Sequence, residues 1–187
     1  MNSMSHDEKK RKNRFTLTVQ DIALIGVMTA VIEVSKIAMS FLPNVELVTF
    51  WIIMFTLFFG PKVLYAIFVF ILIEISIYGL HVWVIMYLYM WPLLALIAYL
   101  FRKKNSVWFY SILSGFFGIC FGAICSVPYI FIGAVDGGIT GGLIMAFNWW
   151  IAGIPFDILH GIANFAIMLV LYTPVRALLT KVRRLEN

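Results

Sequence analysis

The feature that most constrains this chain is a series of long apolar runs separated by short breaks that carry charge, proline or glycine. Of 187 residues, 63% are hydrophobic and only 12% are charged, whereas a soluble domain has about 25% charged residues. A run of about 20 apolar residues is long enough to cross the hydrocarbon core of a bilayer as a helix. The sequence therefore predicts an all-α integral membrane protein, with no room for a soluble catalytic domain.

Basic clusters indicate how these helices are oriented. They precede the first apolar run (9–14), separate the fourth from the fifth (102–104) and follow the last (181–184). Lys and Arg at the ends of spans stay on the cytoplasmic side, so the number of spans is even. We predict six transmembrane helices in one compact bundle with both termini cytoplasmic. The net charge of +5 follows from these clusters and does not indicate a nucleic-acid partner.

The breaks divide the chain into a mobile basic cytoplasmic tail over residues 1–15 and a single membrane domain over residues 16–187. The expected spans are 21–42, 47–59, 63–78, 82–101, one that begins near Val107, and 155–171. Glycine and proline separate several of them, as in Gly60-Pro61-Lys62, because neither residue continues a helix well. The glycine-rich segment 136–142 is expected to be a hinge outside the membrane.

The last apolar run, residues 153–172, carries three polar side chains on one face. Asp157, His160 and Asn164 follow the i, i+3, i+7 spacing of a helix. A carboxylate inside a membrane helix is costly, so it usually faces protein or a wet cavity. Two interpretations remain open: a hydrogen-bonded clamp between helices, or the polar wall of a solute site.

Other polar and aromatic residues are expected at the same, outer end of the bundle. Asn44 and Glu46 follow Pro43 in the loop after the first span, and Trp83 and Tyr87 begin the fourth. The segment 143–152, which contains Asn148 and Trp149, is too short to span and is expected to form a lid or partial helix over this mouth. Aromatic walls with a few hydrogen-bonding groups are typical of a site for a small organic solute.

Two further patterns concern packing. Glu33 and Lys36 are spaced to form an ion pair on the first span, a structural role being favoured over a ligand contact. A stripe of small residues in the fifth span allows another backbone to approach closely, either within this chain or from a partner: Ser111, Gly115, Gly118, Gly122 and Ser126. Cys120 and Cys125 are interpreted as packing residues.

Enzyme functions are disfavoured. The chain has no His-Glu-x-x-His, Gly-x-Ser-x-Gly or P-loop motif, so we expect no catalytic residue, no metal site and no ATP hydrolysis by this chain. A self-sufficient, proton-coupled secondary transporter with Asp157 and His160 as a relay is the alternative from a second class.

The sequence has six short expected spans and a first helix rich in small residues. It also has two characteristic segments, the loop Leu42-Pro-Asn-Val-Glu-Leu-Val48 and the final Gly-Ile-Pro-Phe-Asp157-x-x-His160-x-x-x-Asn164. With these features the chain resembles the substrate-binding S component of energy-coupling factor (ECF) vitamin transporters. The resemblance covers the chain from about residue 16. It implies a subunit of an ATP-driven importer in a prokaryotic cell membrane, with the solute bound at the outer face.

The resemblance also implies partners and a ligand class. S components dock on a membrane scaffold subunit that carries two cytoplasmic ATPase subunits, and here Ala23, Gly26 and Ala30 are the nearest equivalent of the family's docking contact. No cofactor is implied. The chain looks most like S components for cobalamin-type solutes, with pantothenate or another small vitamin as the alternative.

Overall fold

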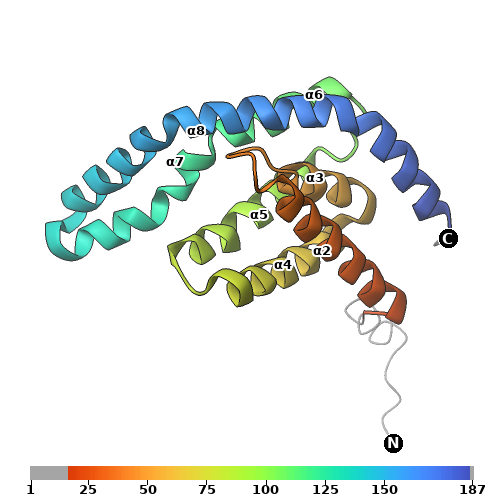
Figure 1. The fold of residues 1–187 in the computed structure, drawn as a ribbon, viewed down its shortest axis with the longest axis horizontal. Helices are drawn as coiled ribbons and strands as arrows, with labels where there is room; N and C mark the ends of the chain where they lie inside the picture. The colour runs from red at the N-terminus through yellow and green to blue at the C-terminus, as the bar shows by residue number, and fades with distance from the viewer. Residues whose placement is uncertain (1–16, 186–187) are drawn as a thin grey trace, which may run out of the picture.

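The computed structural model describes residues 17–185, so the predicted mobile tail over 1–15 lies outside the described residues. The described part is all-helical and contains no strand. Figure 1 shows its elements, which are α2 (Val19–Met39), α3 (Val48–Phe59), η1 (Gly60–Lys62), α4 (Val63–Tyr78), α5 (Val82–Leu100), α6 (Val107–Ile119), α7 (Phe121–Cys125) and α8 (Val127–Leu185).

Local sequence sets several of these boundaries. Thr18 and Asp21 form a reciprocal capping box at the start of α2, which satisfies backbone N–H groups that have no partner inside the helix. Gly60 and Gly79 end α3 and α4 with positive φ values of 60° and 78°, a conformation that glycine adopts without strain. The predicted bounds of these spans agree with the structure to within a few residues.

The C-terminal third differs from the prediction. Within α8, only Gly138 leaves the helical conformation (φ 59°, ψ −168°). The hinge expected over residues 136–142 is therefore confined to this one residue. Residues 139–185 then form one continuous helix, about 70 Å long at 1.5 Å per residue. Of the two forms expected for 143–152, a lid or a partial helix, the structure shows helix: these residues are part of this one long helix, because no proline or positive φ interrupts it there.

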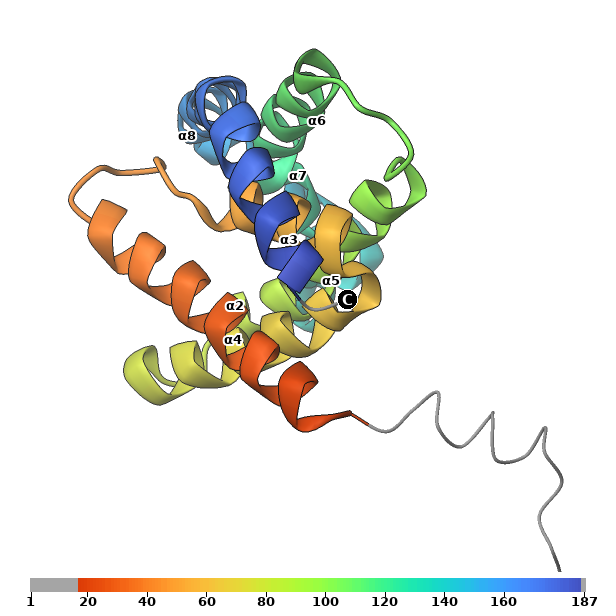
Figure 2. The same ribbon diagram turned by 90° about the vertical axis from the view of Figure 1, so that its right-hand side faces the viewer.

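The two parts of α8 on either side of Gly138 run antiparallel and form a helical hairpin (Figure 1). Close approach is possible because glycines face each other: a Cβ on Gly133 would lie 3.0 Å from the Gly142 Cα. Figures 1 and 2 show α8 arching over α2–α5, with the hairpin reaching beyond them. The predicted single compact bundle is thus only part of the architecture.

The small-residue stripe packs inside this chain. Gly115, Gly118 and Gly122 of α6 and α7 all face α8, where Gly161 lies against the first two. A Cβ on Gly118 would stand 2.8 Å from the Cα and the N of Gly161, so glycine is required for this backbone approach. The question left open by the sequence is therefore answered in favour of an intramolecular contact.

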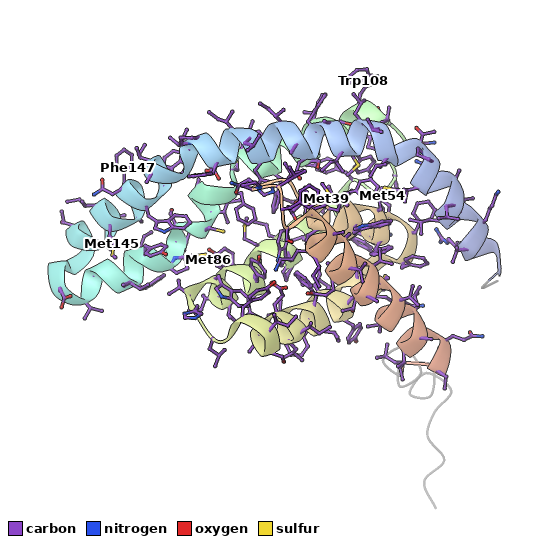
Figure 3. All side chains as sticks on the ribbon, in the orientation of Figure 1. Met39, Met54, Met86, Trp108, Met145 and Phe147 are labelled. Atoms are coloured by element: carbon purple, nitrogen blue, oxygen red, sulfur yellow. The ribbon has the colours of Figure 1, made fainter. Side chains whose placement is uncertain are left out.

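Apolar side chains cover the outside of the molecule as well as its core. Met54 is fully buried among the helices, whereas Trp108 and Phe147 point outward and are 60% and 56% exposed (Figure 3). A monomeric soluble protein rarely exposes contiguous apolar surface on this scale. The described helices include four that are long and apolar enough to cross a membrane: Val19–Met39, Val48–Tyr78, Val82–Leu100 and Val127–Arg183.

This identifies an all-helical membrane protein. The number of spans, predicted as six, and the side on which the termini lie stay predictions. α3 and α4 together form one of the four candidate segments because only η1 separates them, and α6 is shorter than a full span.

Basic residues from distant parts of the chain gather at one end of the molecule. Lys62, Arg102, Lys103 and Arg183 line one surface pocket, and Lys62 pairs with Asp21 at 2.5 Å. The start of α2, the η1 turn, the loop after α5 and the end of α8 therefore lie near one another. This is the arrangement that the positive-inside rule associates with a single membrane face.

Candidate functional site

The polar face predicted for the last span exists, and it points into the protein. Asp157, His160 and Asn164 of α8 are 7%, 5% and 1% exposed. Each of the three has hydrogen-bond partners on a different part of the chain, so the three side chains have different roles.

Asp157 caps a helix start. α6 ends at Ile119 and α7 begins at Phe121, which leaves the N–H of Gly122 without a helical acceptor. The Asp157 Oδ1 accepts a hydrogen bond from this N–H at 3.0 Å, across the two helices. A Cβ at position 122 would overlap this carboxylate. The contact of Asp157 therefore supports the first of the two interpretations left open by the sequence, a hydrogen-bonded clamp between helices.

Replacing Asp157 by alanine should therefore weaken folding and spare solute binding. Loss of a capping acceptor costs about 1–2 kcal/mol, and Asp157 does not line the cavity described below. Unfolding in detergent should show the loss, and Asp136→Ala, at an exposed position next to the hinge, is the control. A variant that folds normally but loses solute would contradict this assignment.

Asn164 also joins helices. Its Nδ2 donates to the Thr49 Oγ1 of α3 at 3.3 Å, and its backbone carbonyl accepts from the Ser114 Oγ of α6 at 3.2 Å. These bonds satisfy buried polar groups that would otherwise be costly. Asn164 therefore fixes α8 against α3 and α6.

His160 differs from its two neighbours because it faces the loop between α2 and α3. Its Nε2 lies 3.2 Å from the Glu46 Oε1, and its ring packs against Phe121 with centroids 4.8 Å apart. Glu46 also accepts from the Val48 N–H and the Thr49 hydroxyl, each at 2.8 Å. The fold thus brings together Glu46 and His160, which are 114 residues apart in the sequence.

Glu46 is held in its charged form. Burial alone raises the pKa of this carboxyl, but hydrogen bonds from His160 and Thr49 outweigh burial and hold the pKa below its usual value. A carboxylate at the start of α3 also interacts favourably with the positive end of the helix dipole. The site therefore carries a fixed negative charge beside an imidazole.

This charge makes stability depend on pH. Because the pKa of Glu46 is lower in the folded protein, its contribution is full above the usual glutamate pKa and is lost as pH falls through the lowered value. We expect unfolding free energies measured across acid pH to fall by on the order of 1 kcal/mol from this group. Glu46→Gln should flatten that part of the curve. An identical pH dependence in the variant would contradict the prediction.

A cavity of about 310 Å³ lies where Glu46 and His160 meet. It is lined by the loop after α2 and by residues of α2, α3, α4, α5, α7 and α8. Its polar and charged members are Lys36, Ser40, Asn44, Glu46 and His160, and its aromatic members are Tyr78, Tyr87, Trp91 and Phe121. The volume lies at the lower end of the range for small-molecule sites.

Lys36 was not predicted in this position. The sequence predicted that it pairs with Glu33, but its ammonium pairs instead with Glu74 of α4 and lies 4.9 Å from the centroid of the Tyr78 ring. The prediction failed because α2 packs against α4 and brings a carboxylate closer than the one on its own helix. Lys36 gives the cavity a cation in addition to the carboxylate of Glu46.

The other predicted binding residues divide in two. Asn44, which adopts a positive φ of 57°, and Tyr87 line the cavity. Trp83 does not line it, but its ring packs edge-on against Tyr87 at 5.1 Å. Asn148 and Trp149 lie on the hairpin, where Asn148 is exposed and Trp149 stacks on Tyr129 at 4.8 Å.

The cavity also has lining residues that the sequence did not assign to a binding site, among them Lys36, Ser40, Tyr78, Trp91 and Phe121. The available signal was Lys36 itself, a charged residue within the predicted first span over 21–42. The aromatic residues could not be distinguished from interfacial or core rings without knowing which helices are neighbours.

The predicted docking residues Ala23, Gly26 and Ala30 are exposed on α2. No atom lies within 4 Å of a Cβ built on Gly26, so this face is uncovered within the described chain. Its role in docking stays a prediction.

Comparison of the chain with known protein families, with curated proteins and with solved structures finds no significant match.

Proposed function

We propose that this chain is the solute-binding membrane subunit of an importer and that it takes a small organic solute in the cavity beside Glu46 and His160. The cavity itself carries the proposal. It combines a cation, an anion and an imidazole with an aromatic wall, the combination of apolar surface and a few placed polar groups that binds small molecules.

The dimensions of the cavity favour a small vitamin over a corrinoid. At about 310 Å³ it accommodates a molecule the size of pantothenate, whereas a cobalamin is several times larger. Lys36 suits a carboxylate on such a solute, and the rings of Tyr87 and Trp91, which line the cavity, suit its apolar part. A thermal-shift assay of the purified chain with pantothenate and with cobalamin tests this: stabilisation by cobalamin alone would contradict it.

We further propose that uptake uses ATP hydrolysed by separate subunits, in the manner of an ECF importer in a prokaryotic cell membrane. The absence of a P-loop from the sequence supports a division of labour, and the clustered basic end would face the cytoplasm. The partners are then a scaffold membrane subunit and two ATPases. Uptake should stop when those ATPases are deleted, and uptake that persists would contradict the proposal.

A proton-coupled secondary transporter is the second candidate. It is favoured by one observation: three ionisable side chains, Glu33, Lys36 and Glu74, lie on membrane-spanning helices, where such groups often mark proton paths. Uptake that needs no ATPase and collapses with an uncoupler would select this function.

A further inference from the structure

Glu33 and Glu74 form a buried pair of carboxyl groups between α2 and α4. They are 8% and 2% exposed. One Glu74 oxygen pairs with Lys36. The other Glu74 oxygen and both oxygens of Glu33 are buried without a hydrogen-bond partner. Glu33 lies close enough to Glu74 and Lys36 to interact electrostatically with both.

The charges in this cluster do not balance if both glutamates are ionised. Glu33 interacts electrostatically with Lys36 on its own helix, with Glu74 on α4 and with Tyr87 on α5, so one ammonium would serve two carboxylates. Like charges this close in a low-dielectric interior do not both ionise, as in paired catalytic carboxylates. A proton on one glutamate removes the excess charge and provides the donor that the unpartnered oxygens lack.

We propose that Glu33 and Glu74 form a proton-binding site that holds one proton, with Lys36 as the counter-ion of the remaining carboxylate. The proton lies on the carboxyl that Lys36 does not pair, and its O–H donates to the other glutamate.

Lys36 connects this site to the cavity. Its side chain is 26% exposed and lines the cavity while it pairs with Glu74. An anionic group bound there shares the ammonium, leaves the glutamate pair without a full counter-ion, and so favours uptake of a second proton. This step rests on the proposed solute-binding function, whereas the proton site itself does not.

Infrared spectroscopy of the full chain in lipid at neutral pH tests the site without any solute. A protonated carboxyl gives a C=O band that a carboxylate lacks. We expect a band in the wild type that loses the intensity of one carboxyl in Glu33→Gln, where Glu74 stays paired, and in Glu74→Gln, where Glu33 ionises against Lys36. Lys36→Met, which mimics removal of the counter-ion, should raise the band about twofold.

Asp136→Asn is the matched control, because Asp136 is exposed and should leave the band unchanged. Circular dichroism identifies variants that keep their helices, and Glu33→Gln, a near-isosteric change, keeps the test valid if Lys36→Met does not fold. A band of undiminished intensity in either glutamine variant overturns the proposal, as does a folded Lys36→Met with no increase. Failure of solute binding would leave these spectra unchanged, so the two proposals fail separately.

Discussion

Gly118→Ala should destabilise the chain by about 1–3 kcal/mol, although alanine is the better helix former. The added methyl would meet the backbone of Gly161 at 2.8 Å and the Asn164 side-chain amide at 3.0 Å. Backbone atoms cannot rotate away as a flexible side chain can, so α6 and α8 must separate. Denaturant titration in mixed micelles, followed by circular dichroism, measures the change.

Gly153→Ala is the matched control for this prediction. Gly153 is also in α8, but nothing lies within 4 Å of its added Cβ. Here the substitution should be neutral or stabilising, by up to about 1 kcal/mol. Equal effects of the two substitutions would show that the α6–α8 contact does not need glycine.

His160→Ala should lower the affinity for the solute at least about tenfold, equivalent to 1.4 kcal/mol. The imidazole lines the cavity and lies against Glu46, so its loss removes a polar contact and leaves a partly buried carboxylate with one partner fewer. Binding to the purified chain is measured by thermal shift or calorimetry with pantothenate.

The same substitution at His81 is the control. His81 precedes α5, is exposed and does not line the cavity, so His81→Ala should bind as the wild type does. If both variants bind equally well, the polar face of α8 is a structural clamp throughout and the solute site lies elsewhere.

Much of the fold followed from local sequence. Gly60-Pro61-Lys62 and Gly79 end helices because of their own backbone preferences, and apolar runs between them had few alternatives to helices. The hairpin around Gly138 could not be predicted in the same way. Four glycines and two polar residues in 136–142 favour a loop. Close packing of Gly133 on Gly142 nevertheless keeps all but one residue helical, which is a tertiary effect.

The site shows the same division between local and tertiary information. Helical periodicity placed Asp157, His160 and Asn164 on one face, and all three are buried together. Periodicity could not show that Asp157 caps α7 while His160 faces a cavity, because that depends on the break between α6 and α7. For the same reason Lys36 was assigned to Glu33 on its own helix, whereas packing of α2 on α4 gives it Glu74.

The central claim is that the cavity beside Glu46 and His160 holds a small organic solute. Mass spectrometry of molecules that copurify with the chain tests it most directly, with His160→Ala and His81→Ala purified in parallel. We predict one small carboxylate-bearing molecule in near-equimolar amount in the wild type and in His81→Ala, and its depletion in His160→Ala. Finding only lipid and detergent in all three, or an equal amount of the molecule in His160→Ala, would contradict the claim.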